Sequence, residues 1–351
     1  MRILSQIYRK KFLHNGIEER LYMINIRFAK IDEIRVIMKF IDDNWKKGHI
    51  LGRDRRFFEW MYVEDNHCNF VIAIDEMQNK IYGILGFIKY NDKINPDVSA
   101  GMWKTIKSDN PMLGNEMREY FIKEMKFRMS NAPGLSKKAI RIEQLMGGGI
   151  GKLNHCYRIN DLDQYNIPII NNKEILPYRK TEYNYREIFD FSEFASIISD
   201  DILKSQSFIK SKKYIKHRYF EHPIFKYIFL VIESSNIEQS LIISREVEHE
   251  GTKILRIIDY IGPQENLVGL GAWMDSILKK NTYEYVDFYN YGISKEILTN
   301  AGFKIRDDKD PNVIPDHFSP FERKNSDIMF IIPEVENFRL FKGDGDQDRP
   351  N

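Results

Sequence analysis

The sequence predicts an α/β protein made of two tandem domains, each with helices packed on a mixed sheet of the α+β kind. The chain has 351 residues, which suits two domains of ordinary size. Apolar residues recur along it with helical and strand periods in turn. The order of these segments in the first half returns in the second half, which indicates a duplicated fold.

The first domain is expected to span residues 23–160. A run at 31–45 has apolar residues at the spacing of one helix face, and a polar turn at 75–79 separates the two strands of a hairpin. Gly and Pro residues mark most of the remaining boundaries. We expect strands at 24–28, 69–73, 81–90, 98–106, 133–135 and 152–159, the last closing the domain, and helices at 31–45, 116–129 and 137–145, the last capped by Ser136.

The second domain is expected to span residues 179–340 and to repeat this order loosely. A linker at 161–178, with two prolines and a pair of asparagines, separates the domains. An N-terminal extension at 1–22, expected to be dispensable for folding, and an acidic, glycine-rich tail at 341–351 complete the chain. We expect strands at 227–233, 239–245, 253–260, 285–289 and 328–332, and helices at 194–203, 271–279 and 293–301.

The bulk composition excludes several classes of protein. The 53 Lys and Arg residues nearly balance the 51 Asp and Glu residues, and the net charge of +2 gives no basis for a nucleic-acid partner. Cys68 and Cys156 are too few for a disulfide framework or a zinc site, and we expect them to be buried apolar residues. No apolar run is long enough to span a bilayer, and no secretory leader is recognisable. We expect a cytoplasmic protein with no membrane insertion and no metal; the sequence predicts no oligomeric state.

A loop at residues 108–115 runs directly into a predicted helix and is the first sign of chemistry. The unpaired N–H groups at the start of a helix, and the positive end of its dipole, favour an anion such as a phosphate. Gly114 would let a ligand approach this backbone closely. An ordinary loop before a helix would look similar, so the loop alone does not define a site.

The element order of residues 23–160, and more weakly of residues 179–340, resembles that of the GNAT acyltransferase superfamily. In that family this loop reads Arg or Gln, two residues, Gly, one residue, then Gly or Ala, and it binds the pyrophosphate of coenzyme A. Gly114 matches the last position, whereas Asp109 and Met112 replace the other two. The resemblance implies that acyl-CoA is the co-substrate and that it binds at Met112, Leu113, Gly114 and Asn115.

A second signature of the family is a helix near the end of the domain, and residues 139–148 resemble it at most positions. Many members carry on this helix a tyrosine that protonates the thiolate of the departing coenzyme A, and Glu143 stands at that position here. Residues 296–303 look like the same helix end in the second domain. The loop at 262–271 of that domain carries Glu265, whose charge opposes a phosphate. We therefore expect acyl-CoA to bind the first domain and not the second.

Residues 151–160, 285–290 and 341–351 resemble segments of the AntD-type nucleotide-sugar N-acyltransferases, which are tandem GNAT proteins. The resemblance implies acyl transfer from acyl-CoA to the amino group of a nucleotide-linked, dTDP-type amino-dideoxy sugar in surface-polysaccharide or glycoconjugate biosynthesis. It also implies that the second domain shapes the sugar site. The expected sugar contacts are Ser99, Tyr157, Asp287, Tyr289, Asn290 and Arg349.

Strand alternation supports part of this set without the resemblance. Tyr285, Asp287 and Tyr289 fall on one face of the strand expected at 285–289. Aromatic rings with a carboxylate suit a sugar or a base, because rings stack and the carboxylate accepts from hydroxyl groups. A half-exposed ordinary strand is the alternative.

Acylation of an amine also needs a group that takes its proton. Asp97, at the start of a predicted strand, and His155, on the last strand of the first domain, are the expected catalytic residues. A strand-edge carboxylate and a hydrogen-bonded core histidine are the alternatives for these two positions. The thiolate of coenzyme A could also take the proton itself.

Two charged segments have more than one interpretation. The tail is either a solvated end, a fixed polar network around Arg349 that folds back onto the sugar site, or the start of a calcium loop formed by Asp344, Asp346 and Asp348. The basic run at 210–218, which includes Tyr214, is either a solvated helix face or a diphosphate site. For the whole chain, the alternatives to a sugar N-acyltransferase are a tRNA-dependent aminoacyl transferase of peptidoglycan type and a non-catalytic binding protein with a decayed first domain.

Overall fold

The computed structural model describes residues 24–350 apart from 236 and 334, and it divides into two compact units. Unit 1 comprises residues 24–88 and 100–128, and unit 2 comprises residues 89–99 and 129–350. The N-terminal extension expected at 1–22 lies outside the described residues. The mixed α/β class with sheets in both halves is confirmed.

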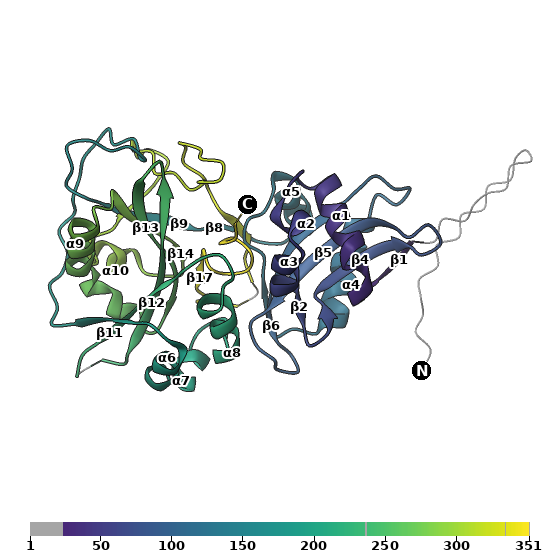
Figure 1. The fold of residues 1–351 in the computed structure, drawn as a ribbon, viewed down its shortest axis with the longest axis horizontal. Helices are drawn as coiled ribbons and strands as arrows, with labels where there is room; N and C mark the ends of the chain where they lie inside the picture. The colour runs from purple at the N-terminus through teal and green to yellow at the C-terminus, as the bar shows by residue number, and fades with distance from the viewer. Residues whose placement is uncertain (1–23, 236, 334, 351) are drawn as a thin grey trace, which may run out of the picture. The chain divides into compact units, whose positions relative to one another are not determined.

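Unit 1 is a set of helices packed on a sheet in the order β1-β4-β5-β6 (Figure 1). Helix α1 buries Ile34, Ile37 and Ile41, the spacing of one helix face, so the helix predicted from that pattern is confirmed. The elements are β1 (Ile24–Phe28), η1 (Ile31–Glu33), α1 (Ile34–Asn44), α2 (Ile50–Arg53), α3 (Arg55–Tyr62), β2 (Val63–Glu64), β3 (His67–Cys68), β4 (Phe70–Asp75), β5 (Lys80–Lys89), β6 (Asp97–Thr105) and α4 (Leu113–Met125).

The core of unit 1 lies between the sheet and helices α1 to α3. Phe58 of α3 stacks on Phe70 of β4 with ring centroids 5.4 Å apart, and both rings are fully buried. Strands β4 and β5 pair antiparallel, which confirms the predicted hairpin. Cys68 is buried and free, as expected.

Unit 2 contains the rest of the described chain (Figure 1). Most of the elements predicted for the second half are present within one to three residues of their expected bounds. The elements are β7 (Met129–Asn131), α5 (Lys137–Leu145), β8 (Ile150–Lys152), β9 (Asn154–Ile159), β10 (Asn184–Ile188), α6 (Phe191–Ile197), α7 (Asp200–Lys204), α8 (Lys212–Ile215), η2 (Lys216–Phe220), β11 (Ile228–Glu233), β12 (Ser240–His249), β13 (Thr252–Ile261), η3 (Gln264–Gly269), α9 (Leu270–Asn281), β14 (Tyr285–Tyr291), α10 (Lys295–Asn300), β15 (Lys304–Ile305), β16 (Met329–Ile331) and β17 (Leu340–Phe341).

The main sheet of unit 2 has the order β10-β11-β12-β13-β14-β9-β15, with β17 also pairing with β14. Strands β13 and β14 run parallel and are joined through α9, whereas β10 to β13 form an antiparallel meander. A parallel pair joined through a helix also occurs earlier, where residues 97–99 of β6 pair with 129–131 of β7 and α4 lies between them in sequence. This repeated arrangement agrees with a duplicated fold.

Two predicted strands behave differently from expectation. The strand expected to close the first domain, at 152–159, instead inserts β9 between β14 and β15 of the larger sheet. The division into units therefore does not coincide with the expected boundary at residue 160. The strand predicted at 133–135 lies earlier, at β7, because Pro133 cannot donate to a ladder and makes only an isolated bridge with Phe330.

The two faces of the larger sheet differ in character. One face carries the main apolar core of unit 2, where Leu255, Ile257 and Phe288 pack against residues of α9 and α10. The opposite face carries a smaller apolar cluster around Tyr157 and Tyr285. The segment at 161–178, expected to be a linker, is hydrogen-bonded to unit 2: the Asn171 and Asn172 N–H groups both donate to Asn312 Oδ1 at 2.9 Å.

Candidate functional site

The start of α4 in unit 1 has the features expected of an anion site. The N–H of Met112 donates to Asn110 Oδ1 at 2.9 Å, which fixes the loop ahead of the helix. The Leu113 N–H donates to the Asn110 carbonyl at 3.3 Å. The N–H groups of Gly114 and Asn115 follow in the first helical turn, where no intrahelical acceptor is available. A Cβ at Gly114 would lie 3.6 Å from Trp103 and Thr105, an ordinary van der Waals contact, so a side chain could start there without displacing these neighbours. Glu116 is acidic, but its carboxylate accepts from Asn110 Nδ2 at 2.9 Å.

The corresponding helix start in unit 2 is closed by the chain itself. Helix α9 begins after η3, and Gly269 and Gly271 lie at this point. The side chain of Thr181 leaves no room for a Cβ at Gly269, and the ring of Tyr178 leaves none at Gly271. Both glycines are therefore packed against side chains that precede β10 in the chain.

His155, one of the two expected catalytic residues, is fully buried on β9 within unit 2. Its Nε2 lies 3.3 Å from Asp287 Oδ2, and its ring stacks on Tyr289 at 3.9 Å between centroids. Its Nδ1 is buried and has no hydrogen-bond partner. Burial lowers the pKa of His155 despite the neighbouring carboxylate of Asp287, so the imidazole is neutral near pH 7. A neutral imidazole with a free ring nitrogen can accept a proton.

Asp287 and Tyr289, two of the expected sugar contacts, share one face of β14, as the strand pattern predicted. The pairing of β9 with β14 brings His155 to the same face. Arg256 of β13 holds the Asp287 carboxylate through Nε and Nη2, at 2.7 Å for the shortest contact. Burial opposes ionisation of Asp287, but the charge of Arg256 prevails and lowers its pKa. Arg256 also pairs with Asp316 at 3.2 Å. Asp287 is thus an ionised anchor for both His155 and Arg256.

Asp97 and Ser99 lie together at the start of β6, within unit 2. Asp97 is completely buried, and its Oδ2 accepts the backbone N–H of Ile209 at 2.6 Å. Ser99 is also buried, and its hydroxyl lies directly against Gly345 of the tail, where it leaves no room for a Cβ. Asp97 therefore has at least one structural role, which is to hold the chain before α8.

Tyr157 and Asn290, also expected sugar contacts, lie on opposite faces of the paired strands β9 and β14. The Tyr157 hydroxyl donates to Asp310 Oδ2 at 2.7 Å and accepts from Asn312 Nδ2 at 3.0 Å. Asn290 is buried beside Cys156, to whose sulfur its Nδ2 donates at 3.4 Å. The structure therefore does not bring Asn290 together with His155 and Asp287.

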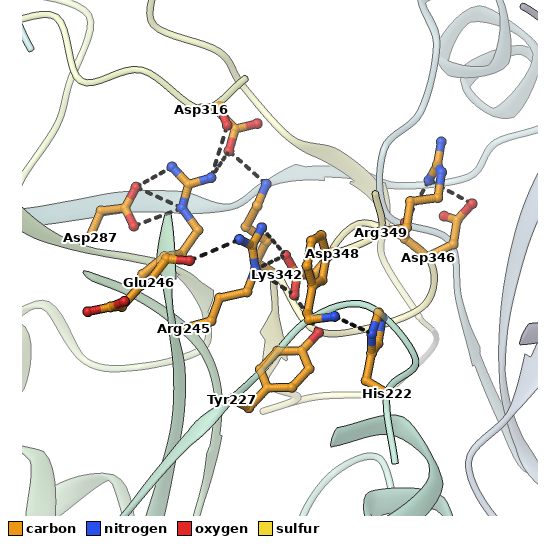
Figure 2. A network of polar contacts seen from close by, with 12 residues as sticks. His222, Tyr227, Arg245, Glu246, Asp287, Asp316, Lys342, Asp346, Asp348 and Arg349 are labelled. Atoms are coloured by element: carbon orange, nitrogen blue, oxygen red, sulfur yellow. Dashed lines mark hydrogen bonds and ion pairs between the residues drawn. The ribbon is translucent and has the colours of Figure 1, made fainter. Parts of the chain in front are cut away.

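The C-terminal tail is buried and held by ion pairs, as Figure 2 shows for most of them. Lys342 Nζ pairs with Asp316 at 2.7 Å, and Lys210 Nζ contacts Asp344 at 2.8 Å. Arg349, the expected sugar contact in the tail, pairs with Asp346 at 2.8 Å. The fixed polar network is thus the interpretation of the tail that the structure supports, and a solvated end is wrong.

The three alternating aspartates of the tail do not form a calcium loop. Asp344 faces Lys210, Asp346 faces Arg349, and Asp348 faces Arg245, so each carboxylate is already matched by a different cation. Within residues 24–350, with 236 and 334 left aside, no group of His, Cys, Asp and Glu side chains is placed to hold a metal ion.

The basic run at 210–218 is solvated on one side only: Lys213, Lys216 and His217 are exposed, whereas Lys210, Tyr214 and Arg218 are buried in unit 2. Lys210 Nζ bridges Asp259 at 2.6 Å and Asp344 at 2.8 Å, and these two carboxylates raise its pKa although burial opposes the charge. Arg218 Nη2 donates to the backbone carbonyl of Asp348 at 2.8 Å. The two buried cations of the run, Lys210 and Arg218, therefore contact the tail.

Sequence reasoning missed the charged residues of β12 and β13 that organise this region: Arg245, Arg256 and Asp259. A bulge explains why Arg256 and Asp259 share a face, since Ile243 pairs with Asp259 and Ser244 with Ile257, which leaves Ile258 without a partner. The free carbonyl of Ile258 accepts the Gly343 N–H of the tail at 2.8 Å. Charged residues inside an otherwise apolar strand were the available signal, because a buried charge requires a partner.

Glu143, which stands at the position of the family tyrosine, is completely buried in α5 of unit 2. The helix has the predicted bounds, and the hydroxyl of Ser136 accepts the Ala139 N–H at 3.2 Å as its cap. The Gly148 N–H donates to the carbonyl of Glu143 at 2.9 Å.

None of the helices found among residues 24–350, leaving aside 236 and 334, is long and apolar enough to cross a membrane.

Comparison with known proteins gives a fold but no family by sequence. No protein-family model and no curated protein matches the chain. Among solved structures, it is similar to a conserved protein of unknown function from Enterococcus faecalis V583, described as a probable N-acyltransferase, with 9% identity and a TM-score of 0.53 over 81% of this chain and 70% of that one. It is also similar to a GCN5-related N-acetyltransferase from Anabaena variabilis, with 10% identity and a TM-score of 0.53 over 88% of this chain and 72% of that one.

These similarities define the class of fold to which the chain belongs. The chain shares its α/β fold with these two structures over most of its length. At such low identity the likeness concerns the fold alone, and the chemistry has to be inferred from the residues of this chain.

Proposed function

We propose that this protein is an acyl-CoA-dependent N-acyltransferase that binds its acyl donor at the start of α4. The observation that carries the proposal is the difference between the two equivalent helix starts. The turn at Gly114 has N–H groups without an intrahelical acceptor and room for a Cβ, whereas the ring of Tyr178 leaves no such room at Gly271. A helix start with free N–H groups binds a phosphate through hydrogen bonds and through the helix dipole.

The acceptor in this proposal is the amino group of a nucleotide-linked amino-dideoxy sugar, with dTDP as the expected nucleotide. Support comes from the placement of the three segments that resemble the sugar N-acyltransferases. Strand β9 pairs with β14, and β14 pairs with β17 at the start of the tail, so segments far apart in sequence meet in one sheet. A shared site for one substrate would require such a meeting.

The proposed reaction forms a C–N bond and breaks the C–S bond of the thioester. The neutral amine attacks the thioester carbon, its proton passes to a base, and the thiolate of coenzyme A leaves and is protonated. His155 suits the role of base better than Asp97 does, because Asp97 accepts a backbone N–H whereas His155 Nδ1 has no partner. The acid that protonates the thiolate is not the family tyrosine, because Glu143 stands at its position.

Titration of the purified protein with acetyl-CoA, dTDP and a charged tRNA tests this proposal against its alternatives. We expect saturable binding of acetyl-CoA with one site per chain, and binding of dTDP without binding of tRNA. Binding of tRNA in place of dTDP would favour an aminoacyl transferase of peptidoglycan type. Absence of acetyl-CoA binding would favour a non-catalytic protein with a decayed donor site and would refute the proposal.

A further inference from the structure

One face of the sheet in unit 2 carries a band of polar side chains that crosses four strands, and all of them except Arg245 are buried. The band includes Arg245 on β12, Arg256 and Asp259 on β13, Asp287 on β14 and His155 on β9. Direct pairing in the sheet places these side chains on the same face. The tail lies along this band. Asp348 pairs directly with Arg245. Lys342 reaches the band through Asp316, which pairs with Arg256, and Asp344 reaches it through Lys210, which pairs with Asp259.

Asp348 is held by several hydrogen-bond donors at the end of the band that lies on β12. Arg245 donates to Asp348 Oδ1 from Nε at 2.9 Å and from Nη2 at 2.8 Å, and the Tyr227 hydroxyl donates to Oδ2 at 2.8 Å, as Figure 2 shows. Arg218 adds a hydrogen bond to the backbone carbonyl of the same residue. Two guanidinium groups and a hydroxyl therefore converge on one acidic residue. We call Arg218, Tyr227 and Arg245 the arginine socket.

The arginine socket is largely buried, and without the carboxylate of Asp348 it carries the positive charges of two guanidinium groups. Arg218 is 3% exposed, and the side chain of Arg245 is 13% exposed. Burial, with the charge of Arg218 next, lowers the pKa of the neighbouring His222 to about 3. Burial opposes ionisation of Asp348, yet the charge and hydrogen bonds of Arg245 lower its pKa to about 2. The arginine socket therefore stabilises a negative charge at a buried position.

A phosphate group matches the arginine socket at least as well as a carboxylate does. A guanidinium that donates two parallel N–H bonds has the geometry of carboxylate and phosphate recognition, and buried sites strengthen such bonds. A diphosphate also carries more negative charge than the single carboxylate of Asp348. The acceptor that we propose contains a diphosphate and reaches unit 2, where the segments of sugar-transferase type meet.

We infer that the arginine socket is the phosphate-binding site for the nucleotide-linked acceptor, and that Asp348 occupies it until the acceptor displaces the tail. This inference rests on the proposed function, because it takes the acceptor class from there. The tail is then an intramolecular competitor. Removal of the Asp348 charge should leave the socket available and raise the affinity for the diphosphate, because a site blocked by its own chain binds with reduced apparent affinity.

The test compares dTDP binding to the full-length chain and to three variants by titration and thermal shift. We expect Asp348→Asn to melt lower than the native chain without ligand, to bind dTDP at least about tenfold more tightly, and to regain melting temperature when dTDP is added. Asp346→Asn is the matched control, because it makes the same charge change in the tail outside the socket, and it should bind dTDP as the native chain does. Arg245→Gln should lose dTDP binding. An Asp348→Asn variant that binds dTDP no more tightly, or an Arg245→Gln variant that still binds it, overturns the inference.

A second measurement decides the matter if Asp348→Asn does not fold. Saturating dTDP should speed amide hydrogen exchange in residues 341–349 of the native chain, and unchanged exchange there overturns displacement of the tail. Inorganic phosphate and acetyl-CoA are tested separately in the same experiment. If either one speeds exchange in residues 341–349 as much as dTDP does, the assignment of the arginine socket to the acceptor is overturned. Acetyl-CoA binding is measured in parallel: its absence together with normal dTDP binding refutes the proposed donor site and leaves the arginine socket standing.

Discussion

Replacement of Gly114 by valine is the substitution that separates ligand binding from folding most cleanly. The fold should tolerate it, because the added Cβ would be 3.6 Å from its nearest neighbours and Gly114 lies within a helix. Valine has a higher helix propensity than glycine, so α4 should not be weakened. A bound pyrophosphate, by contrast, would meet the branched side chain at the first turn.

The expected loss follows from the two N–H groups of that turn. A hydrogen bond to a charged group contributes about 1.5–3 kcal/mol, so displacement of the phosphate from both should cost about 3 kcal/mol or more. This corresponds to a dissociation constant raised about 150-fold. Isothermal titration with acetyl-CoA measures the affinity, and a melting curve monitors the fold. Lys123→Val, on the exposed side of the same helix, is the control and should bind normally. Affinity of Gly114→Val within threefold of native would refute the assignment of the donor site.

Three further predictions concern unit 2. Arg256→Met should lower the free energy of unfolding by about 3–5 kcal/mol, because it leaves buried carboxylates without their cation, whereas Arg55→Met at an exposed pair should cost less than about 1 kcal/mol. Because the pKa of Asp348 is about 2 instead of 3.8, its ionised form should stabilise the fold above about pH 4, and about 2 kcal/mol should be lost as the pH falls from 4 to 2. If His155 is the base, His155→Asn should lower turnover at least about 100-fold and leave acetyl-CoA binding unchanged. If Asp97 is the base, Asp97→Asn should have this effect instead.

Each of these predictions has a measurement that can contradict it. Urea unfolding should separate Arg256→Met from Arg55→Met, and equal midpoints would show that the buried network is not needed for stability. When urea unfolding is repeated from pH 5 to pH 2, the free energy of unfolding of Asp348→Asn should depend less steeply on pH than that of the native chain. Steady-state turnover decides between the bases, and a loss of only a few-fold in both variants would favour proton transfer to the coenzyme A sulfur.

Local structure could be predicted from the sequence wherever one segment determines it. Strand β1 and helix α5 have the predicted bounds, since a short alternating run and a helix cap are properties of neighbouring residues. The shared face of Asp287 and Tyr289 followed from strand alternation. The contact between Asp287 and His155 did not follow, because it depends on β9 pairing with β14 and their sequence separation is 132 residues.

The tail shows why the rest of the site could not be predicted. Its aspartates, and the basic run at 210–218, each look like solvated charge when considered alone. The two segments contact each other in the fold, where Lys210 pairs with Asp344 and Arg218 donates to the backbone carbonyl of Asp348. A buried charge requires a partner, but the local pattern of each segment does not indicate that the other segment supplies it.

Acceptor-dependent release of the coenzyme A thiol is the most direct test of the proposed acyltransferase. Purified protein is mixed with acetyl-CoA and a dTDP-linked 4-amino-4,6-dideoxy sugar, and free thiol is followed with a thiol-reactive dye. We expect release that depends on the amino sugar, is absent with the matching 4-hydroxy sugar, and disappears in Gly114→Val. Thiol release at the same rate with and without the amino sugar, from a protein that binds acetyl-CoA, would contradict N-acyl transfer to an amino sugar.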